Sequence, residues 1–508
     1  MPEERNLSMR DCEMTKSVYP KQERITALLL FFSNLIICLM IWMERTYDQV
    51  RLDQILFQIK SYSTGVYGAL SASAVFYVGF FSVGLTALEA LLYKFLSEKW
   101  YEKHPKFLYV RKHLLSVAAA ILLITLAVFG TRIKIIPYVK ADVTDSTFIQ
   151  THYVKPENSI LRFPEQKRNL IHIILESMES TYAEPTDGET IKACYIPELK
   201  SLAENNVNFS HTNGLGGALS FPGTTWTAAS MVAQTSGVVI KVSLRADTYG
   251  AGDVFLPGVT SIGQFLDEQG YNQVLLLGSN AEFHGREIYF TEHGNYSILD
   301  TDALKAAGRL PEDYDKWWGF EDEKLFSYAK EELTRLAAAG APFNLTMLTA
   351  DTHFPDGCHC DLCGDDYEEP YANVLACSSR QTADFVDWIM KQPFYENTTI
   401  VISGDHLTMD AGFMEEMNPD YTRTIYNCFI NAAVEPVKEN NRQFGTFDLY
   451  PTTLAAMGVE IEGDRLALGT NLFSDKETLT EEFGYEYLVE ELQKQSDFYD
   501  KELLLLEN

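Results

Sequence analysis

Three long apolar segments near the N-terminus constrain this chain more than any other feature. Ile25–Met43 and Ala69–Leu88 carry no charged residue, and Leu114–Gly130 is followed by Arg132 and Lys134. Each segment approaches the roughly 20 apolar residues that an α-helix needs to cross a bilayer. Buried core helices can be as long, but three in close succession favour membrane spans. The first segment is not a cleavable signal peptide, because a polar stretch precedes it and it lacks a small-residue cleavage site.

The flanking charges predict an orientation for these spans. Basic residues are frequent in the N-terminal tail and between the second and third segments, and are fewer between the first and second. Loops rich in Lys and Arg stay in the cytoplasm. Three spans therefore place the chain after about residue 135 outside the cytoplasm, in a multi-pass membrane protein.

The two parts of the chain differ in charge. The first 140 of the 508 residues hold 17 basic and 11 acidic residues, and the remainder holds 24 basic and 60 acidic ones. So acidic a C-terminal part argues against nucleic-acid binding, which depends on basic patches. We interpret it as a solvated surface that also tolerates cations.

Six of the eight cysteines lie in the part expected outside the cytoplasm, namely Cys194, Cys358, Cys360, Cys363, Cys377 and Cys428. An even number of cysteines in an oxidising compartment favours disulfides, and Cys363–Cys377 is the first expected pair. The alternative is a zinc site at Cys358, Cys360 and Cys363 with His359, although the first spacing is tighter than in most zinc sites.

Strand and helix signals alternate through the C-terminal part. Apolar runs predict buried strands at Asn169–Leu175, Asn272–Leu277, Phe343–Ala350 and Thr398–Ser403. Their alternation with helical segments predicts an α/β domain, with a mainly parallel sheet and helices on both faces. The expected organisation is a membrane region at 1–135, a connector at 136–165, an α/β domain at 166–475 and an acidic helical tail at 476–508.

Acidic residues and a histidine follow two of these strands. Glu176 comes directly after Leu175, and Asp405 and His406 come after Gly404. The carboxyl edge of such a sheet is where α/β proteins bind ligands. We therefore predict a divalent metal ion held by Glu176, Asp405 and His406. Mixed oxygen and nitrogen ligands suit manganese or zinc better than magnesium, and manganese is the expected ion.

Thr224 is the predicted nucleophile. It lies in the turn that begins at Pro222, where a helix is predicted over Gly223–Ser236. Taken alone, Thr224 would be interpreted as a helix cap. Beside the metal, its oxygen would become a fourth ligand with a lowered pKa, and the helix N-terminus would favour a phosphate group next to it.

Two further residues are predicted to contact a substrate. His353 follows the strand at Phe343–Ala350 and could donate a hydrogen bond to a phosphoryl oxygen or protonate a leaving group. Arg286, in the segment Phe283–Arg286, could form a bidentate contact with a phosphate. A loop histidine that caps a helix and an ordinary surface arginine are the alternative interpretations.

With these residues the chain resembles the lipoteichoic acid synthase and phosphoglycerol transferase group of the sulfatase/alkaline phosphatase superfamily. The matching segments are FPEQKRNLIHIILESMESTY, FPGTTWTAASMVAQTSG, FLPGVTSIGQFLDEQGY, TADTHFPDG and VISGDH, within residues 145–460. The resemblance implies an alkaline-phosphatase-like fold. It also implies metal ligands at Glu176, Asp405 and His406, a nucleophile at Thr224, and glycerol-phosphate contacts at His353 and Arg286.

The sequence departs from the lipoteichoic acid synthases around the nucleophile. Those enzymes have a lysine before the threonine and an acidic residue after it, where this chain has Gly223 and Thr225-Trp226. This difference leaves the acceptor open. Nor does Cys194-Tyr-Ile-Pro-Glu supply the C/S-x-P-x-R motif from which the sulfatase branch makes its modified nucleophile.

The resemblance implies a membrane-anchored enzyme that takes glycerol phosphate from phosphatidylglycerol and forms a threonine-linked intermediate. It would pass the group to an extracytoplasmic glycan or polyglycerol-phosphate acceptor. The rivals are a phosphoethanolamine transferase, a sulfatase-like phosphodiesterase or hydrolase, and a catalytically inactive envelope scaffold. The complete set of predicted site residues argues against the scaffold.

Overall fold

The computed structural model describes residues 3–48, 51–60, 73–100, 106–186, 190–242, 254–314 and 316–505. The described residues form two compact units. One contains those within 1–50 and 67–137, and the other those within 51–66 and 138–508. The second unit includes residues from the connector and the acidic tail, and a short segment from between the first two apolar segments.

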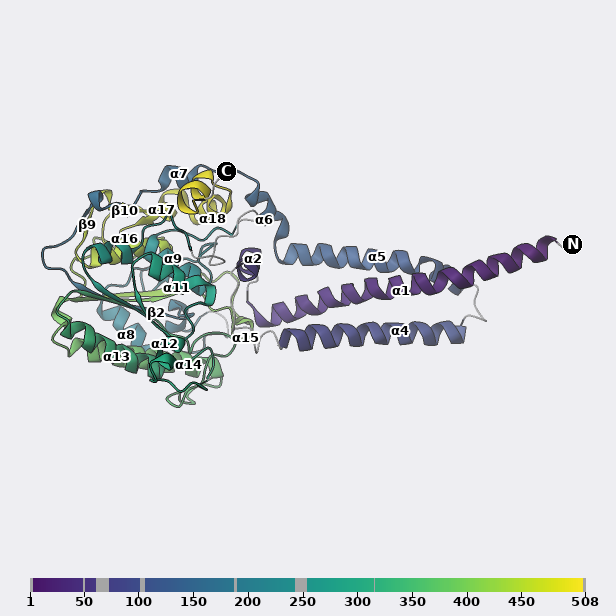
Figure 1. Ribbon diagram of the computed structural model, residues 1–508, viewed down its shortest axis with the longest axis horizontal. Coiled ribbons are helices and arrows are strands. Elements are labelled where there is room, and N and C mark those ends of the chain that lie inside the picture. Colours follow the sequence, from purple (N-terminus) through teal and green to yellow (C-terminus); the bar gives the residue numbers. More distant parts are fainter. Residues whose placement is uncertain are drawn as a thin grey trace. The chain divides into compact units, whose positions relative to one another are not determined.

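The first unit consists of long apolar helices (Figure 1). They are α1 (Glu3–Thr46), a π-helical turn (Val75–Phe80) that leads into α4 (Phe81–Trp100), and α5 (Lys106–Arg132). Three stretches are long and apolar enough to cross a membrane, at Lys21–Thr46, Val75–Leu96 and His113–Arg132. The predicted apolar helices are therefore confirmed, although the second extends further along the chain than Ala69–Leu88, and residues 69–72 lie outside the described part.

The second unit is built around a sheet of seven strands. In sheet order they are β3 (Gly217–Ala218), β8 (Ile425–Ile430), β7 (Thr398–Gly404), β2 (Asn169–Leu175), β6 (Phe343–Leu348), β4 (Asn272–Leu277) and β5 (Ser297–Leu299). The strands from β7 to β5 run parallel, and β8 is antiparallel to β7. All seven residues of the central strand β2 are buried, as expected for a strand covered on both faces.

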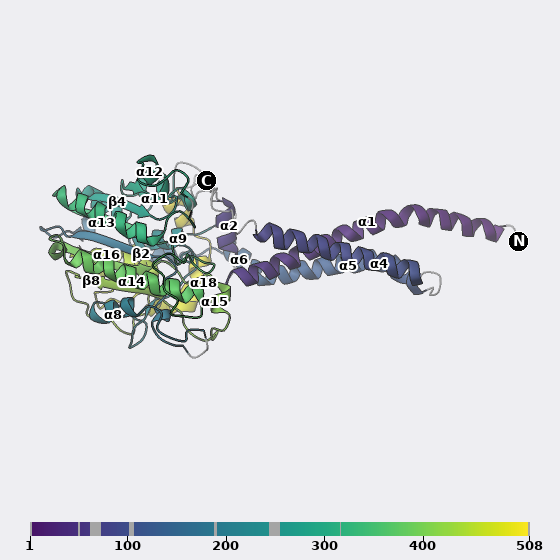
Figure 2. The same ribbon diagram turned by 90° about the horizontal axis from the view of Figure 1, so that it is seen from below.

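Alternate residues of β2 supply two separate cores. Ile171 and Ile173 belong to the core that includes residues of α8 (Pro197–Asn205), α13 (Asp322–Ala338) and α14 (Pro370–Met390). Leu170 and Ile174 belong to the core that includes residues of α9 (Thr227–Ser236), α10 (Ile262–Glu268), α11 (Arg286–Glu292) and α16 (Leu449–Ala456). Side chains alternate across a strand, so β2 serves both layers. Figures 1 and 2 show helices on the two sides of β2, which confirms the predicted α/β class.

The sequence predicts a helical acidic tail, and the structure shows several short helical elements there instead of one helix. It contains α17 (Leu479–Phe483), α18 (Tyr485–Gln493) and a π-helical turn (Tyr499–Leu503). Gly484, with φ of 82°, separates the first two elements, because this conformation ends a helix. Leu488, Leu492, Tyr499 and Leu503 are buried in the core on the α9 side. The tail is therefore an integral part of the α/β unit.

A short helix from the N-terminal third also joins this unit. It is α2 (Leu52–Lys60), which comes between the first two apolar segments. Its Phe57 is 1% exposed, and the Phe57 ring lies 4.9 Å from that of Trp226. Gln54 donates hydrogen bonds to the carbonyl and hydroxyl oxygens of Thr225, at 3.0 and 2.8 Å. Helix α2 therefore packs against the turn that precedes α9.

Candidate active site

Strand register brings the predicted acidic residues together. In the parallel pair β2 and β7, Leu175 lies opposite Gly404, so Glu176 and Asp405 are the next residues on neighbouring strands. An alanine at Gly404 would put its Cβ 2.0 Å from the Met178 carbonyl oxygen, so the close approach of the segment after β2 to the end of β7 requires glycine.

Glu176, Asp405 and His406 form one cluster, whose candidate ligand atoms all lie within 4.8 Å of one another. His406 Nε2 lies 3.5 Å from Glu176 Oε1 and 3.3 Å from Asp405 Oδ2. All three side chains are buried. The structure thus brings together the three residues that the sequence analysis selected as metal ligands.

Hydrogen bonds leave one side of Asp405 without a partner. Its Oδ1 accepts from the backbone N–H groups of Ser177 and His406, both at 2.7 Å. Its Oδ2 is buried and has no hydrogen-bond partner among the described residues. An unpaired buried carboxylate oxygen is costly unless a cation compensates it. The donor set therefore fits a bound metal ion.

The pKa shifts of Asp405 and His406 also favour a cation in the cluster. Burial and the neighbouring charge of Glu176 raise the pKa of Asp405 to about 8. Burial alone would lower the pKa of His406, but the two carboxylates outweigh it and raise that pKa. Two close carboxylates therefore favour a positive charge beside them, which a proton or a metal ion can supply.

The imidazole of His406 is oriented for ligation. His406 Nδ1 lies 2.8 Å from the carbonyl oxygen of Leu407, a contact that places the ring proton on Nδ1. When His406 is neutral, the lone pair of Nε2 faces Glu176 and Asp405. Fixing the tautomer through the remote nitrogen is the usual arrangement for metal-binding histidines.

Thr227, and not Thr224, presents its hydroxyl to the cluster. Thr227 Oγ1 donates to Glu176 Oε2 at 3.1 Å and lies 3.4 Å from His406 Nε2. The buried hydroxyl of Thr224 donates instead to the carbonyl oxygen of Phe221, at 2.9 Å. The structure therefore brings Thr227, and not the predicted Thr224, into contact with the cluster, because α9 begins at Thr227 and Thr224 precedes the helix.

Helix α9 is fixed to the end of β7 by its polar face. Ser230 donates to the carbonyl oxygen of Asp405, and Gln234 donates to that of Gly404 at 2.9 Å. Thr227, Ser230 and Gln234 are spaced three and four residues apart, so they share one face of the helix. This spacing is the sequence signal by which Thr227 could have been found.

His353 lies within electrostatic reach of the cluster. Burial lowers its pKa, and the charge of Glu176 partly opposes that effect. His353 Nδ1 lies 2.7 Å from the carbonyl oxygen of Phe354, which leaves Nε2 for another partner. The ring of Trp318 lies 4.4 Å from that of His353 and was not singled out from the sequence.

Arg286 is buried at the start of α11 and is not a surface arginine. Its Nε donates to the carbonyl oxygen of Phe283 at 3.1 Å, and its Nη2 donates to Ser279 Oγ and to the Asn280 carbonyl oxygen. Burial lowers its pKa to about 10, while Glu176 and nearby aspartates oppose that shift. Among the described contacts, Nη1 makes no hydrogen bond and can take another acceptor.

His284 is a further site residue that the sequence analysis missed, although its segment was noted for Arg286. His284 Nε2 is buried and lacks a partner among the described residues. Burial, with the charges of Arg286 and His353, holds the pKa of His284 well below its ordinary value. A neutral imidazole and a guanidinium with a spare donor are thus grouped near the cluster.

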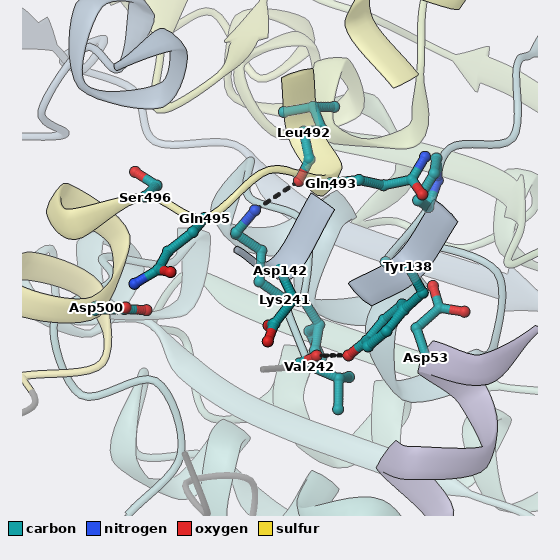
Figure 3. A pocket seen from close by; sticks show the side chains of 13 residues that line it. Asp53, Tyr138, Asp142, Lys241, Val242, Leu492, Gln493, Gln495, Ser496 and Asp500 are labelled. Carbon is teal, nitrogen blue, oxygen red and sulfur yellow. Dashed lines mark hydrogen bonds between the residues drawn. The ribbon is translucent and has the colours of Figure 1, made fainter. Parts of the chain in front are cut away.

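A separate small cavity lies in the same unit, lined in part by Asp53, Tyr138, Asp142 and Lys241 (Figure 3). Lys241 donates to the carbonyl oxygens of Leu492 and Lys494, so its ammonium group is already engaged. None of the clustered residues Glu176, Asp405 and His406 lines this cavity.

Comparison with known proteins identifies the family. A family model described as Sulfatase matches residues 168–459, more than half of the chain. The chain therefore belongs to the sulfatase family. Phosphoglycerol transferase I of Escherichia coli (strain SMS-3-5 / SECEC) is 29% identical over 331 residues, which cover 64% of this chain and 41% of that protein. The same enzyme of Salmonella choleraesuis (strain SC-B67) is 29% identical over 340 residues, covering 65% and 42%. The chain thus matches about two fifths of the length of these relatives.

Solved structures are similar in fold. The lipooligosaccharide phosphoethanolamine transferase A of Neisseria meningitidis, an integral membrane protein, has a TM-score of 0.51 at 13% identity, over 88% of this chain and 87% of that one. A lipoteichoic acid synthase of Listeria monocytogenes has a TM-score of 0.49 at 17% identity, over 64% and 80%.

Proposed function

We propose that this protein is a membrane-anchored phosphoglycerol transferase that uses Thr227 as its nucleophile. The observation that carries the proposal is the contact of the Thr227 hydroxyl with both Glu176 and His406, at the first residue of α9. A threonine needs activation to attack phosphorus, and it is otherwise a weak nucleophile. The similarity to phosphoglycerol transferase I supports glycerol phosphate as the transferred group.

Glu176, Asp405 and His406 would hold one divalent metal ion, for which manganese and zinc suit the donor set. When bound, the ion would lower the pKa of the threonine hydroxyl and offset negative charge on the phosphoryl group. The observation that supports a bound metal ion is the buried Oδ2 of Asp405, which has no hydrogen-bond partner among the described residues.

The reaction would proceed in two displacements at phosphorus. The Thr227 oxygen bonds to the phosphorus of phosphatidylglycerol, the bond to the diacylglycerol oxygen breaks, and the proton lost by Thr227 ends on that oxygen. The oxygen of an acceptor hydroxyl then bonds to the phosphorus of the threonine-linked glycerol phosphate, the bond from phosphorus to the Thr227 oxygen breaks, and the proton lost by the acceptor ends on that oxygen. The positive N-terminus of α9 favours the phosphate group in both steps.

His353, His284 and Arg286 would act on the substrate. His353 is the group that we assign to relay the proton, because Nδ1 is engaged and Nε2 is available. Arg286 Nη1 would bind a non-bridging phosphate oxygen, and the neutral His284 would hydrogen-bond the glycerol. The buried Nε2 of His284 has no hydrogen-bond partner among the described residues, and the hydrogen bonds of Arg286 in the described part of the chain engage only its Nε and Nη2.

The connectivity of the units supports an extracytoplasmic site. Helix α2 and the residues after Tyr138 belong to the same unit, so both lie on one side of a membrane. The two apolar helices between them, Val75–Leu96 and His113–Arg132, would then cross it as a pair. The basic N-terminal tail favours a cytoplasmic N-terminus, which places the α/β unit outside.

The test is a donor assay with the full-length protein in detergent and manganese. Phosphatidylglycerol labelled in its terminal glycerol should yield diacylglycerol and labelled acceptor, with polyglycerol phosphate and a glycan offered separately. Phosphatidylethanolamine labelled in its ethanolamine is the matched control. Turnover of the ethanolamine lipid alone would overturn the proposal in favour of a phosphoethanolamine transferase, and release of free glycerol phosphate alone would indicate a phosphodiesterase.

A further inference from the structure

A second group of potential metal ligands lies on the loop that follows β6. Cys360 and Cys363 belong to this loop, and Cys377 lies in α14, which the loop enters. We call these three residues the thiol cluster. Their sulfur atoms all lie within 4.8 Å of one another. Cys360 is 8% exposed and Cys377 2%, so most of the cluster is shielded from solvent.

The sulfur–sulfur distances match those around a tetrahedral metal ion. Cys360 Sγ lies 3.6 Å from Cys363 Sγ and 3.7 Å from Cys377 Sγ. Zinc–thiolate bonds of about 2.3 Å, at tetrahedral angles, put neighbouring sulfurs about 3.8 Å apart. The Cys363–Cys377 disulfide predicted from the sequence is not formed, and the described cysteines are all free. Cys360 Sγ lies close to the sulfur atoms of both Cys363 and Cys377. A disulfide between any two of these three cysteines would therefore leave the third sulfur beside the new bond.

A neighbouring polar side chain also contacts the thiol cluster. Gln381 donates to Cys377 Sγ at 3.3 Å. Hydrogen bonds to sulfur from groups around a site are typical of metal-bound thiolates, which they stabilise.

We propose that Cys360, Cys363 and Cys377 bind a zinc ion that fastens the loop after β6 to α14. Three soft sulfur ligands select zinc over manganese or magnesium. A solvent molecule or a fourth side chain completes the coordination. This site is separate from the oxygen- and nitrogen-rich cluster at Glu176, and the inference does not depend on the proposed reaction.

His353 lies on the same loop as Cys360 and Cys363, so a zinc ion at the thiol cluster would also affect the segment that contains His353. Between β6 and the thiol cluster, Cys358 N–H donates to the carbonyl oxygen of Asp351 at 2.6 Å. Thr352 donates to the carbonyl oxygen of Glu176 at 2.5 Å. These hydrogen bonds hold the start of the segment that contains His353, and a zinc ion at the thiol cluster would restrain its C-terminal end.

The experiment is zinc K-edge X-ray absorption on the full-length protein, purified in detergent with zinc and without reductant. The Glu176 cluster offers no sulfur, so scattering from sulfur at about 2.3 Å reports the thiol cluster alone. We expect this sulfur shell in the wild type, fewer sulfur neighbours in Cys360→Ser, and an unchanged shell in Cys194→Ser. Cys363→Ser, at a partly exposed position, serves as a second variant if Cys360→Ser does not fold.

Hydrogen exchange tests the consequence for the loop. The peptide that spans Asp351–Cys363 should exchange faster in Cys360→Ser than in wild type or Cys194→Ser. A wild type without the sulfur shell, or one whose non-reduced peptides show a disulfide between two cysteines of the thiol cluster, would overturn the proposal. A sulfur shell that survives in both cluster variants would overturn it as well.

Discussion

Truncation of Phe57 should uncouple α2 from the active site. Phe57 is 1% exposed, and its ring lies 4.9 Å from Trp226 and 5.1 Å from His284. Replacing a buried phenylalanine with alanine costs about 3–5 kcal/mol. Helix α2 has nine residues, too few to be stable alone, so we expect the cost to fall on its docking.

The expected magnitude follows from that cost. A loss of about 3 kcal/mol in docking changes the docked-to-undocked ratio of α2 by a factor of about 100. Phe57→Ala should therefore speed hydrogen exchange through the undocked state by up to about 100-fold in both α2 and the turn at Thr225, and should lower the transferase kcat. Phe57→Leu keeps most of the buried volume and should show a much smaller effect. Unchanged activity and exchange in Phe57→Ala would refute the idea that α2 supports the nucleophile.

The remaining predictions concern the acids and the histidine of the site. Asp405→Asn should abolish turnover while the unit stays folded. In metal-free wild type, burial and Glu176 raise the pKa of Asp405 from 3.8 to about 8. Protonated Asp405 therefore adds its full contribution to the free energy of unfolding below about pH 4, and that contribution is lost as the pH rises through about 8. Thermal unfolding in chelator should accordingly show a melting temperature that falls with pH in the wild type and falls less in Asp405→Asn; parallel curves would contradict this. His353→Asn should lower kcat, and because burial lowers the pKa of His353, the wild-type rate should decline only below the ordinary histidine range.

Much of the sheet could be predicted from the sequence because its central strands are buried and mostly apolar. Asn169–Leu175 and Asn272–Leu277 have the predicted bounds, and the parallel register of β2 and β7 follows from α/β topology. The proximity of Glu176, Asp405 and His406 could be predicted because Glu176 and Asp405 directly follow two such strands and His406 is the next residue.

The nucleophile could not be chosen by the same argument. Thr224 and Thr225 precede α9 and Thr227 is its first residue, so which hydroxyl faces the cluster depends on where α9 begins. No apolar periodicity marks that start, since every residue of α9 is buried except Thr227. The docking of α2 was missed for a related reason: its contacts with Trp226 and Thr225 join residues about 170 positions apart.

The measurement that tests the central claim most directly is peptide mass spectrometry of the enzyme trapped with phosphatidylglycerol and no acceptor. We predict a phosphoglycerol adduct on Thr227, no adduct in Thr227→Ala, and nearly normal adduct formation in Thr224→Ala if that variant folds. Diacylglycerol should appear in step with the adduct. An adduct on Thr224 or Thr225, or steady turnover by Thr227→Ala, would contradict the account.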